Sequence, residues 1–495
     1  MLQFLAILPV LATDLIRVDI PDHPEAIATS TRGSTLTHVP SDGTPWRTAP
    51  IPEPTEFKSD GWAATEAIDA LGAAPWHAAG IDGEGVKMAI FDIQWFGLEQ
   101  HPTLSDLPSH DCFGHRSCAL PIDTIHPQFA FETGSHGLAC AEVVQAIAPG
   151  VELHLVRVNG LTALENATAW AVREDIDLVS MSMSFFSESF YDGTGSINDA
   201  VDTLVDAGIL LVSSAGNYAR QHRAEHFEDR DINGRHEFEG GSEFLPVYLP
   251  KGTTRVSLTW DEYQQCGATD LDAYIYDEEG FLVGRSTRAQ SRDDDNCFPL
   301  ERINAFAETE DWYYLMVHKA GGHGDVRFKV MTRAGQIHEP TEAGSITDPG
   351  SHPHVFTVGA VDASGYRSNP VEGFSSQGPT PSGADKPDIA GPDGLSTSNY
   401  GPAGFYGTSA ATPSVAAAIA LLLSRDPSLS PRTAAIRLAD SALSMDPVWA
   451  PPDPALGAGL ARLPPLQESH TGCGKGTPLL MVLCWIPLAA IRKRN

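Results

Sequence analysis

Basic residues are scarce in this sequence. It has 32 lysines and arginines against 64 aspartates and glutamates in 495 residues, a formal net charge of −32. Because nucleic-acid binding needs a basic surface that releases counterions from the phosphates, we expect no nucleic-acid partner. A phosphate-binding glycine loop and a His-Glu-x-x-His zinc helix are also missing. With 42% hydrophobic and 19% charged residues, the chain is not of the disordered class. Its length allows about three domains, or one large domain with an insertion.

Two apolar runs near the ends read as processing signals. Residues 1–12 are almost wholly apolar, and Val10 and Ala12 supply the small residues of a cleavage site, although no Lys or Arg precedes them. We predict a signal peptide here, with a mis-assigned start or an ordinary apolar strand as the alternatives. Residues 477–491 form a second run, which follows Cys473 and precedes a basic end. This run is short for a membrane-spanning helix, which needs about 20 residues.

The C-terminal arrangement resembles the sorting tails of some bacterial surface proteins, in which a small-residue motif, an apolar segment and a basic end follow one another. We predict that residues 465–495 are a sorting tail or membrane anchor, with the membrane or the sorting machinery as partner. The basic end is expected to stay cytoplasmic in either case. The two ends together predict an exported protein that is extracellular or anchored at the cell surface.

Cysteine is also scarce, with seven residues. Cys112 and Cys118 are close enough for a small-loop disulfide, and Cys266 with Cys297 would close a larger loop. A metal site at the first pair is the alternative, but a second pair of ligands is missing from its surroundings. Cys140 is left over, and we expect it to be buried because a free cysteine packs as a small apolar group.

Strand-length apolar runs alternate with helix-length segments in residues 61–224 and again in residues 346–464. This alternation predicts an α/β fold, a parallel sheet with helices on both faces. The expected strands are 86–91, 151–158, 178–183, 209–213 and 355–358, and the expected helices are 162–174, 196–207, 409–424, 431–443 and one that begins near residue 136.

Residues 225–345 have a different pattern, short strands separated by turn residues. We predict that they form an inserted β-sandwich. The expected strands are 247–249, 255–260, 272–276, 312–317 and 326–330. Residues 13–60 show no periodicity and are expected to be a pro-segment or an extended arm.

Four short motifs carry the chemistry. Asp92 ends an apolar strand, His136 opens a helix in Ser-His-Gly, Asn217 follows a strand in Ala-Gly-Asn, and Ser409 begins a helix in Gly-Thr-Ser. Each motif alone has a structural explanation, such as a helix cap. Their order, Asp, His, Asn and Ser, is the subtilisin-like order of catalytic residues, so the chain resembles the subtilase family of serine peptidases.

Further segments support the resemblance, which covers residues 61–222 and 346–463. They are His-Pro-Thr-Leu at 101–104, Met-Ser-Met-Ser at 181–184, Phe-Ser-Ser-Gln-Gly-Pro at 374–379, Lys-Pro-Asp-Ile-Ala at 386–390 and Gly-Ala-Gly-Leu at 457–460. The resemblance implies a subtilisin-like fold, protein or peptide substrates, a monomer and no required cofactor or metal.

The resemblance also assigns roles to the motif residues. Ser409 would be the nucleophile, and His136 would take its proton and later give it to the leaving amine. Asp92 would hold the imidazole in the correct tautomer. Asn217 would donate its side-chain amide to the oxyanion, together with the backbone N–H of Ser409.

The same family pattern makes residues 182–184 a substrate-binding edge strand. Ser182, Met183 and Ser184 would pair with the substrate backbone. Ser184 stands where the family usually has a glycine, at the mouth of the specificity pocket, and is expected to narrow that pocket. Ile93 and Gln94 stand where the family has Ser or Thr and then Gly, so a hydroxyl that would hold the Asp92 carboxylate is missing.

The segment 269–277 resembles β-sandwich modules that accompany secreted bacterial peptidases. Its aspartates, Asp270, Asp272 and Asp277, could supply oxygen ligands for a structural Ca²⁺, but we favour a solvated acidic turn. The sequence as a whole predicts a secreted or surface-anchored serine endopeptidase. The alternative is a surface binding or adhesion protein on a catalytically impaired subtilase scaffold.

Overall fold

The computed structural model describes residues 64–113, 117–123, 134–263, 268–290, 298–445 and 452–466. The predicted signal peptide, the segment 13–60, the pair Cys266 and Cys297, and nearly all of the predicted tail lie outside these ranges. In the part of the chain that is described, no helix has the length and apolar character needed to cross a membrane. The described residues from Ala64 to Pro464 belong to one compact unit.

A seven-stranded sheet forms the centre of the α/β part, and its neighbouring strands are all parallel. This confirms the predicted fold class. The strand order is β16-β15-β5-β4-β1-β3-β2. The strands are β1 (Lys87–Asp92), β2 (Ser109–Asp111), β3 (Glu152–Arg157), β4 (Leu178–Met181), β5 (Leu210–Ser214), β15 (Phe356–Asp362) and β16 (Ile389–Asp393).

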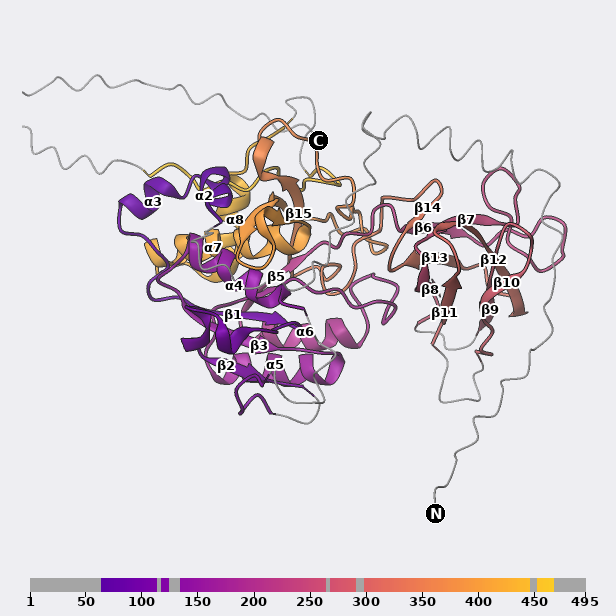
Figure 1. Ribbon diagram of the computed structural model, residues 1–495, viewed down its shortest axis with the longest axis horizontal. Coiled ribbons are helices and arrows are strands. Elements are labelled where there is room, and N and C mark those ends of the chain that lie inside the picture. Colours follow the sequence, from indigo (N-terminus) through magenta and orange to yellow (C-terminus); the bar gives the residue numbers. More distant parts are fainter. Residues whose placement is uncertain are drawn as a thin grey trace, which may run out of the picture. The chain divides into compact units, whose positions relative to one another are not determined.

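Helices cover both faces of this sheet. On one face, Trp170 of α5 and Val201 of α6 share a buried core with Phe91 of β1 and Val179 of β4. Figure 1 shows α4 and α7 on the other side of the sheet from α5 and α6. The helices are α2 (Thr65–Leu71), α3 (Ala74–Ala78), α4 (His136–Ile147), α5 (Leu161–Arg173), α6 (Ser196–Asp206), α7 (Thr408–Arg425) and α8 (Pro431–Asp440).

Two antiparallel sheets lie between β5 and β15 in the sequence. One has the order β10-β9-β12-β7-β14 and the other β11-β8-β13-β6. Residues of both sheets, among them Trp260, Leu315 and Phe328, share one apolar core. The strands are β6 (His222–His226), β7 (Leu245–Leu249), β8 (Gly252–Trp260), β9 (Thr269–Tyr276), β10 (Leu282–Ser286), β11 (Leu300–Ala307), β12 (Asp311–Gly322), β13 (Arg327–Thr332) and β14 (Gln336–Ile337). The domain boundaries at 225 and 345 stay predictions.

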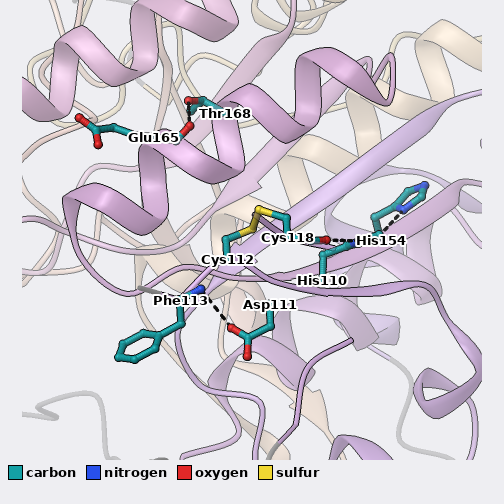
Figure 2. Close-up of a disulfide and its surroundings, with 8 residues drawn as sticks. All are labelled: His110, Asp111, Cys112, Phe113, Cys118, His154, Glu165 and Thr168. Atoms are coloured by element: carbon teal, nitrogen blue, oxygen red, sulfur yellow. Dashed lines mark hydrogen bonds between the residues drawn. A yellow bond between two sulfur atoms is a disulfide. The ribbon is translucent and has the colours of Figure 1, made fainter. Parts of the chain in front are cut away.

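A disulfide joins Cys112 to Cys118 beside the edge strand β2, as the cysteine spacing predicted. Both sulfur atoms are therefore unavailable as metal ligands. Figure 2 shows His110 next to this bridge. Its imidazole bonds to the Cys118 carbonyl and to the ring of His154 on β3, each at 3.2 Å. The bridge and the histidine pair thus fasten the loop after β2 to the sheet.

Candidate active site

The four predicted catalytic residues lie at or just after the ends of two parallel strands and at the starts of two helices. Asp92 is the last residue of β1, and His136 is the first residue of α4. Asn217 follows the end of β5 at Ser214, and Ser409 lies in the first turn of α7. The carboxyl ends of parallel strands meet at one edge of a sheet, which is where α/β folds bind their ligands.

Asp92 and His136 are joined directly. The Nδ1 atom of His136 lies 2.6 Å from Oδ2 of Asp92, whose side chain is fully buried. The other carboxylate oxygen accepts the backbone N–H of Gln94 at 3.1 Å. The Asp92 carboxylate is therefore held on both oxygens, one of them by a backbone donor, although the sequence lacks the expected hydroxyl.

The glycine that follows His136 has a packing reason. A Cβ atom at Gly137 would lie 2.9 Å from the Trp95 ring and 3.0 Å from Cβ of Asp92. The indole N–H of Trp95 donates to the Asp92 carbonyl at 3.0 Å, which fixes the ring there. A side chain at position 137 would therefore push α4 away from β1 and lengthen the bond between His136 and Asp92.

The electrostatics of His136 fit a general base with an acidic partner. Burial alone would lower the pKa of its imidazole, but the charge of Asp92 and the hydrogen bonds to Asp92 and Cys140 raise this pKa well above its ordinary value. Cys140 lies one helical turn below His136, buried and free as expected, with Sγ 4.0 Å from Nδ1. Burial raises the pKa of the Cys140 thiol.

Two hydrogen bonds join Ser409 to Ser182. The Ser409 hydroxyl donates to the Ser182 carbonyl at 3.4 Å, and the Ser182 hydroxyl donates to the Ser409 carbonyl at 3.0 Å. Between the described side chains of Ser409 and His136 there is no hydrogen bond. Catalytic hydrogen bonds are often long or misaligned before substrate binds, so the role of Ser409 stays a prediction.

Asn217 is positioned by the residue before the serine. Its Oδ1 atom accepts the backbone N–H and the hydroxyl of Thr408, both at 3.0 Å. The Nδ2 atom, which donates, is thereby turned toward the start of α7. Gly407 has φ of 102°, and a Cβ atom there would lie 2.9 Å from Nδ2 of Asn217, so both its backbone and its surroundings require glycine.

Comparison with known proteins decides the family. The sequence profile described as "Subtilase family" matches residues 126–256 and 302–470, which is more than half of the chain. The chain belongs to the subtilase family. The matched ranges contain His136, Asn217 and Ser409, whereas Asp92 lies ahead of them.

Individual relatives support the assignment. The subtilase is 30% identical over 161 residues to a thermostable alkaline protease of Halalkalibacterium halodurans, covering 29% of this chain and 39% of the relative. It is 34% identical over 166 residues to subtilisin E of Bacillus subtilis, covering 30% and 39%. The chain thus spans about two fifths of the length of these relatives.

A solved structure shows the same fold over a longer range. The CspB protease of Clostridium perfringens matches 81% of this subtilase and 96% of its own chain, with a TM-score of 0.55 and 15% identity. At this identity the match shows the fold alone.

The predicted substrate-binding residues lie beyond the end of β4, which stops at Met181 rather than at residue 183. The strand ends there because β1 and β5 pair with it only as far as Met181. Met183 packs partly against the core under α5 and α6. The Ser184 hydroxyl accepts a hydrogen bond from the buried hydroxyl of Thr347 at 2.8 Å.

Sequence reasoning missed several residues of this subtilase site. Thr408 and Thr347 act through hydrogen bonds to predicted residues, and Phe405 places its ring edge-on to His136 at 5.6 Å. Asp393 is buried at the end of β16 and accepts the backbone N–H of Gly407 at 2.8 Å. Thr408 was visible in the Gly-Thr-Ser motif, but only the structure assigns a partner to the other three.

Potential metal ligands gather at one place among the described residues. Asp92, His136 and Cys140 each bring a ligand atom within 4.8 Å of the others. The His136 Nδ1 atom in this group already bonds to Asp92, so the arrangement fits an orienting hydrogen bond without a metal. Directly after β9, Asp277 accepts the backbone N–H groups of Glu279 and Phe281, as in a turn.

Proposed function

We propose that this subtilase is a serine endopeptidase that hydrolyses peptide bonds through an acyl-enzyme on Ser409. The observation that carries the proposal is the 2.6 Å bond between His136 Nδ1 and the buried Asp92 carboxylate. It fixes the imidazole so that its other nitrogen is the one left for Ser409. Ser409 and Asn217 lie at the same edge of the sheet, and the family relatives are proteases.

The proposed reaction begins with the Ser409 hydroxyl. Its Oγ leaves the Ser182 carbonyl and turns toward Nε2 of His136, which takes the proton as Oγ attacks the substrate carbonyl. The oxyanion that forms accepts hydrogen bonds from the Asn217 amide and the Ser409 backbone N–H. His136 then gives its proton to the leaving amine, and a water molecule hydrolyses the acyl-enzyme by the same steps in reverse.

The proposed substrates are proteins or peptides with a small side chain before the cleaved bond. Residues 182–184 have no strand partner after β4 ends, so they are available to pair with an extended peptide. The bond between Ser184 and Thr347 closes the space beside this segment. The Tyr218 ring lies against Gly216, where a Cβ atom would approach it to 2.8 Å.

The proposed location is outside the cytoplasm, with the chain acting as a monomer that is secreted or anchored at the cell surface. The disulfide between Cys112 and Cys118 supports it, because such bonds persist in oxidising compartments. The apolar residues 1–12 and the tail 465–495 support export and anchoring. N-terminal sequencing of protein collected outside the cells should begin close after residue 12, whereas a start at Met1 would contradict a cleaved signal peptide.

Fluorophosphonate labelling tests the activity. The reagent bonds only to an activated serine, so the full chain should be labelled at Ser409 and the Ser409→Ala variant should not. His136→Ala, with Ser409 intact, should lose labelling by several orders of magnitude. A folded wild-type sample without labelling would contradict the proposal and favour the alternative, a surface binding protein on an impaired scaffold.

A further inference from the structure

A cavity of about 220 Å³, lined by none of the four candidate catalytic residues, lies where β6 and β13 meet the segments around Gly344 and Pro379. Phe190, Pro379 and Pro381 line it with apolar surface, and Arg327 and Lys329 line it with cationic groups. Arg327 and Lys329 are two residues apart on β13, so their side chains lie on the same face of the strand.

Lys329 is unusual because it is buried without a counterion. Only 2% of the residue is exposed. Its Nζ donates to the Gly344 carbonyl at 3.0 Å and lies over the rings of Phe190 and Tyr191, at 4.9 and 5.0 Å. No carboxylate of the described residues forms an ion pair with it. A buried ammonium group with one hydrogen bond and no anion is costly, so an anion beside it would be strongly favoured.

The carboxylates near Lys329 already have other partners. Glu225, which also lines the cavity, is held by Arg223 and by His236 at 3.0 Å. Asp348 is buried and accepts hydrogen bonds from neutral side chains, Ser189 and Asn198 among them. The cavity therefore offers donors and lacks a free acceptor that would neutralise them.

Arg327 adds a second cationic group to this cavity. Its guanidinium carbon lies 5.7 Å from the centre of the Phe190 ring, which also carries the Lys329 amine on its face. An exposed ion pair with Asp261 at 3.0 Å is the only partner described for its charge. Guanidinium groups bind carboxylates with two parallel hydrogen bonds, so Arg327 can contact an anion while remaining near Asp261.

We propose that this cavity binds a small monocarboxylate with an apolar side chain, such as an N-acyl amino acid or the free C-terminus of a short peptide. The carboxylate lies between Lys329 and Arg327, and the apolar part contacts Phe190, Pro379 and Pro381. This is a binding site of its own and does not depend on peptide hydrolysis at Ser409.

Protonation of Lys329 should accompany binding. Burial lowers the pKa of its amine to about 7, although Asp348 and Asp192 act to raise it, and Arg327 lowers it further. His222 lies on the same side of Gly344 as Lys329, since a Cβ atom at Gly344 would be 3.9 Å from each of them. It remains neutral because burial and the Lys329 charge lower its pKa to about 3. An anion restores the ammonium form, so binding takes up a proton near neutral pH and weakens as the pH rises above 7.

Calorimetric titration of the full chain tests the proposal. N-acetyl-L-leucine is the probe, and N-acetyl-L-leucinamide, which has the same shape without the charge, is the control ligand. We expect the acid to bind at least tenfold more tightly than the amide at pH 6. The affinity for the acid should fall about 30-fold between pH 6 and pH 8.5, since the protonated fraction of a group with pKa 7 falls by that factor.

Variants assign the effect to the buried amine. Lys329→Met keeps the length of the side chain and should lose at least tenfold in affinity for the acid, whereas Lys251→Met, at an exposed lysine of the same part of the chain, should bind as the wild type does. His226 also lines the cavity. If Lys329 causes the pH dependence, the affinity of His226→Gln for the acid should still fall above pH 7, as that of the wild type does.

Three results would overturn the proposed carboxylate site. Equal binding of acid and amide by the wild type, or full binding by folded Lys329→Met, overturns the proposal. Absence of any binding of the acid at pH 6 overturns it as well. If Lys329→Met fails to fold, the comparison of acid with amide and the proton uptake, measured as a buffer-dependent enthalpy in HEPES and Tris, decide it in the wild type.

Discussion

The hydroxyl of Thr347 donates a hydrogen bond to the hydroxyl of Ser184, across 2.8 Å and between residues that are 163 positions apart. The bond joins the loop after β4 to the loop before β15, beside the predicted substrate-binding segment. In the proposed peptidase, a bulky substrate side chain beside this segment would meet both of these side chains. Thr347 is fully buried, so it cannot move aside into solvent.

Replacing Thr347 should widen the specificity pocket. In Thr347→Ala, we expect kcat/KM for peptides with leucine before the cleaved bond to rise about tenfold relative to peptides with alanine, since one or two added methylene groups are worth about that factor in a pocket. Thr347→Ser keeps the bond to Ser184 and should show a smaller change. An unchanged ratio in the alanine variant would mean that Thr347 does not limit the pocket. The measurement is a matched pair of peptide substrates.

The pH dependence should report the bond between His136 and Asp92. Burial lowers the pKa of His136, but Asp92 and Cys140 together raise it well above 6.5. A general base acts only when it is neutral, so kcat/KM should rise with pH through an apparent pKa above 6.5. In Asp92→Asn the rise should move to lower pH, and the maximal rate should fall by about 10⁴. A wild-type rise centred at or below 6.5 would contradict this account.

Thr408 should act through Asn217. Asn217→Ala should lower kcat by about 10²–10³, the usual loss for one oxyanion donor. Thr408→Val removes the hydroxyl that bonds to Asn217 Oδ1 and should lower kcat by about tenfold with little change in KM. In the Asn217→Ala background the valine substitution should have almost no further effect. Additive losses would show that Thr408 acts by another route.

Asp393 should make the stability of the fold depend on pH. Burial and the nearby carboxylates of Glu372 and Asp362 raise its pKa well above the ordinary value. A group with a raised pKa contributes most stability below its unfolded pKa and loses that contribution as the pH rises through its folded pKa. The melting temperature of Asp393→Asn minus that of the wild type should therefore be more positive at pH 8 than at pH 4. A difference that is the same at both pH values would contradict the raised pKa.

The parallel sheet and its helices could be predicted because their patterns are local. Strands such as β1 and β5 are continuous apolar runs that end in a polar residue, and α7 is a long run of small apolar residues. β11 was missed, although its burial alternates residue by residue along Leu300–Ala307. Its polar outward-facing residues interrupt the apolar run that would have marked it.

The candidate site was predictable as far as its motifs extend. Asp92, His136, Asn217 and Ser409 each stand in a recognisable short segment. The partners of these segments are not encoded nearby: Thr347 is far from Ser184 in the sequence, and the bond from Gln94 to Asp92 is made by the backbone, which any residue could supply. The orientation of the Ser409 hydroxyl is a matter of rotamer, on which the sequence is silent.

The placement of the two antiparallel sheets has a consequence for the order of synthesis. β5 and β15 are neighbours in the parallel sheet, yet the chain from residue 215 to residue 355 lies between them. α7, whose second residue is the proposed nucleophile Ser409, packs against β4, β5, β15 and β16. A growing chain that emerges N-terminus first therefore completes the Asp92 and His136 elements early, but it carries no assembled nucleophile until nearly 200 further residues have followed Asn217.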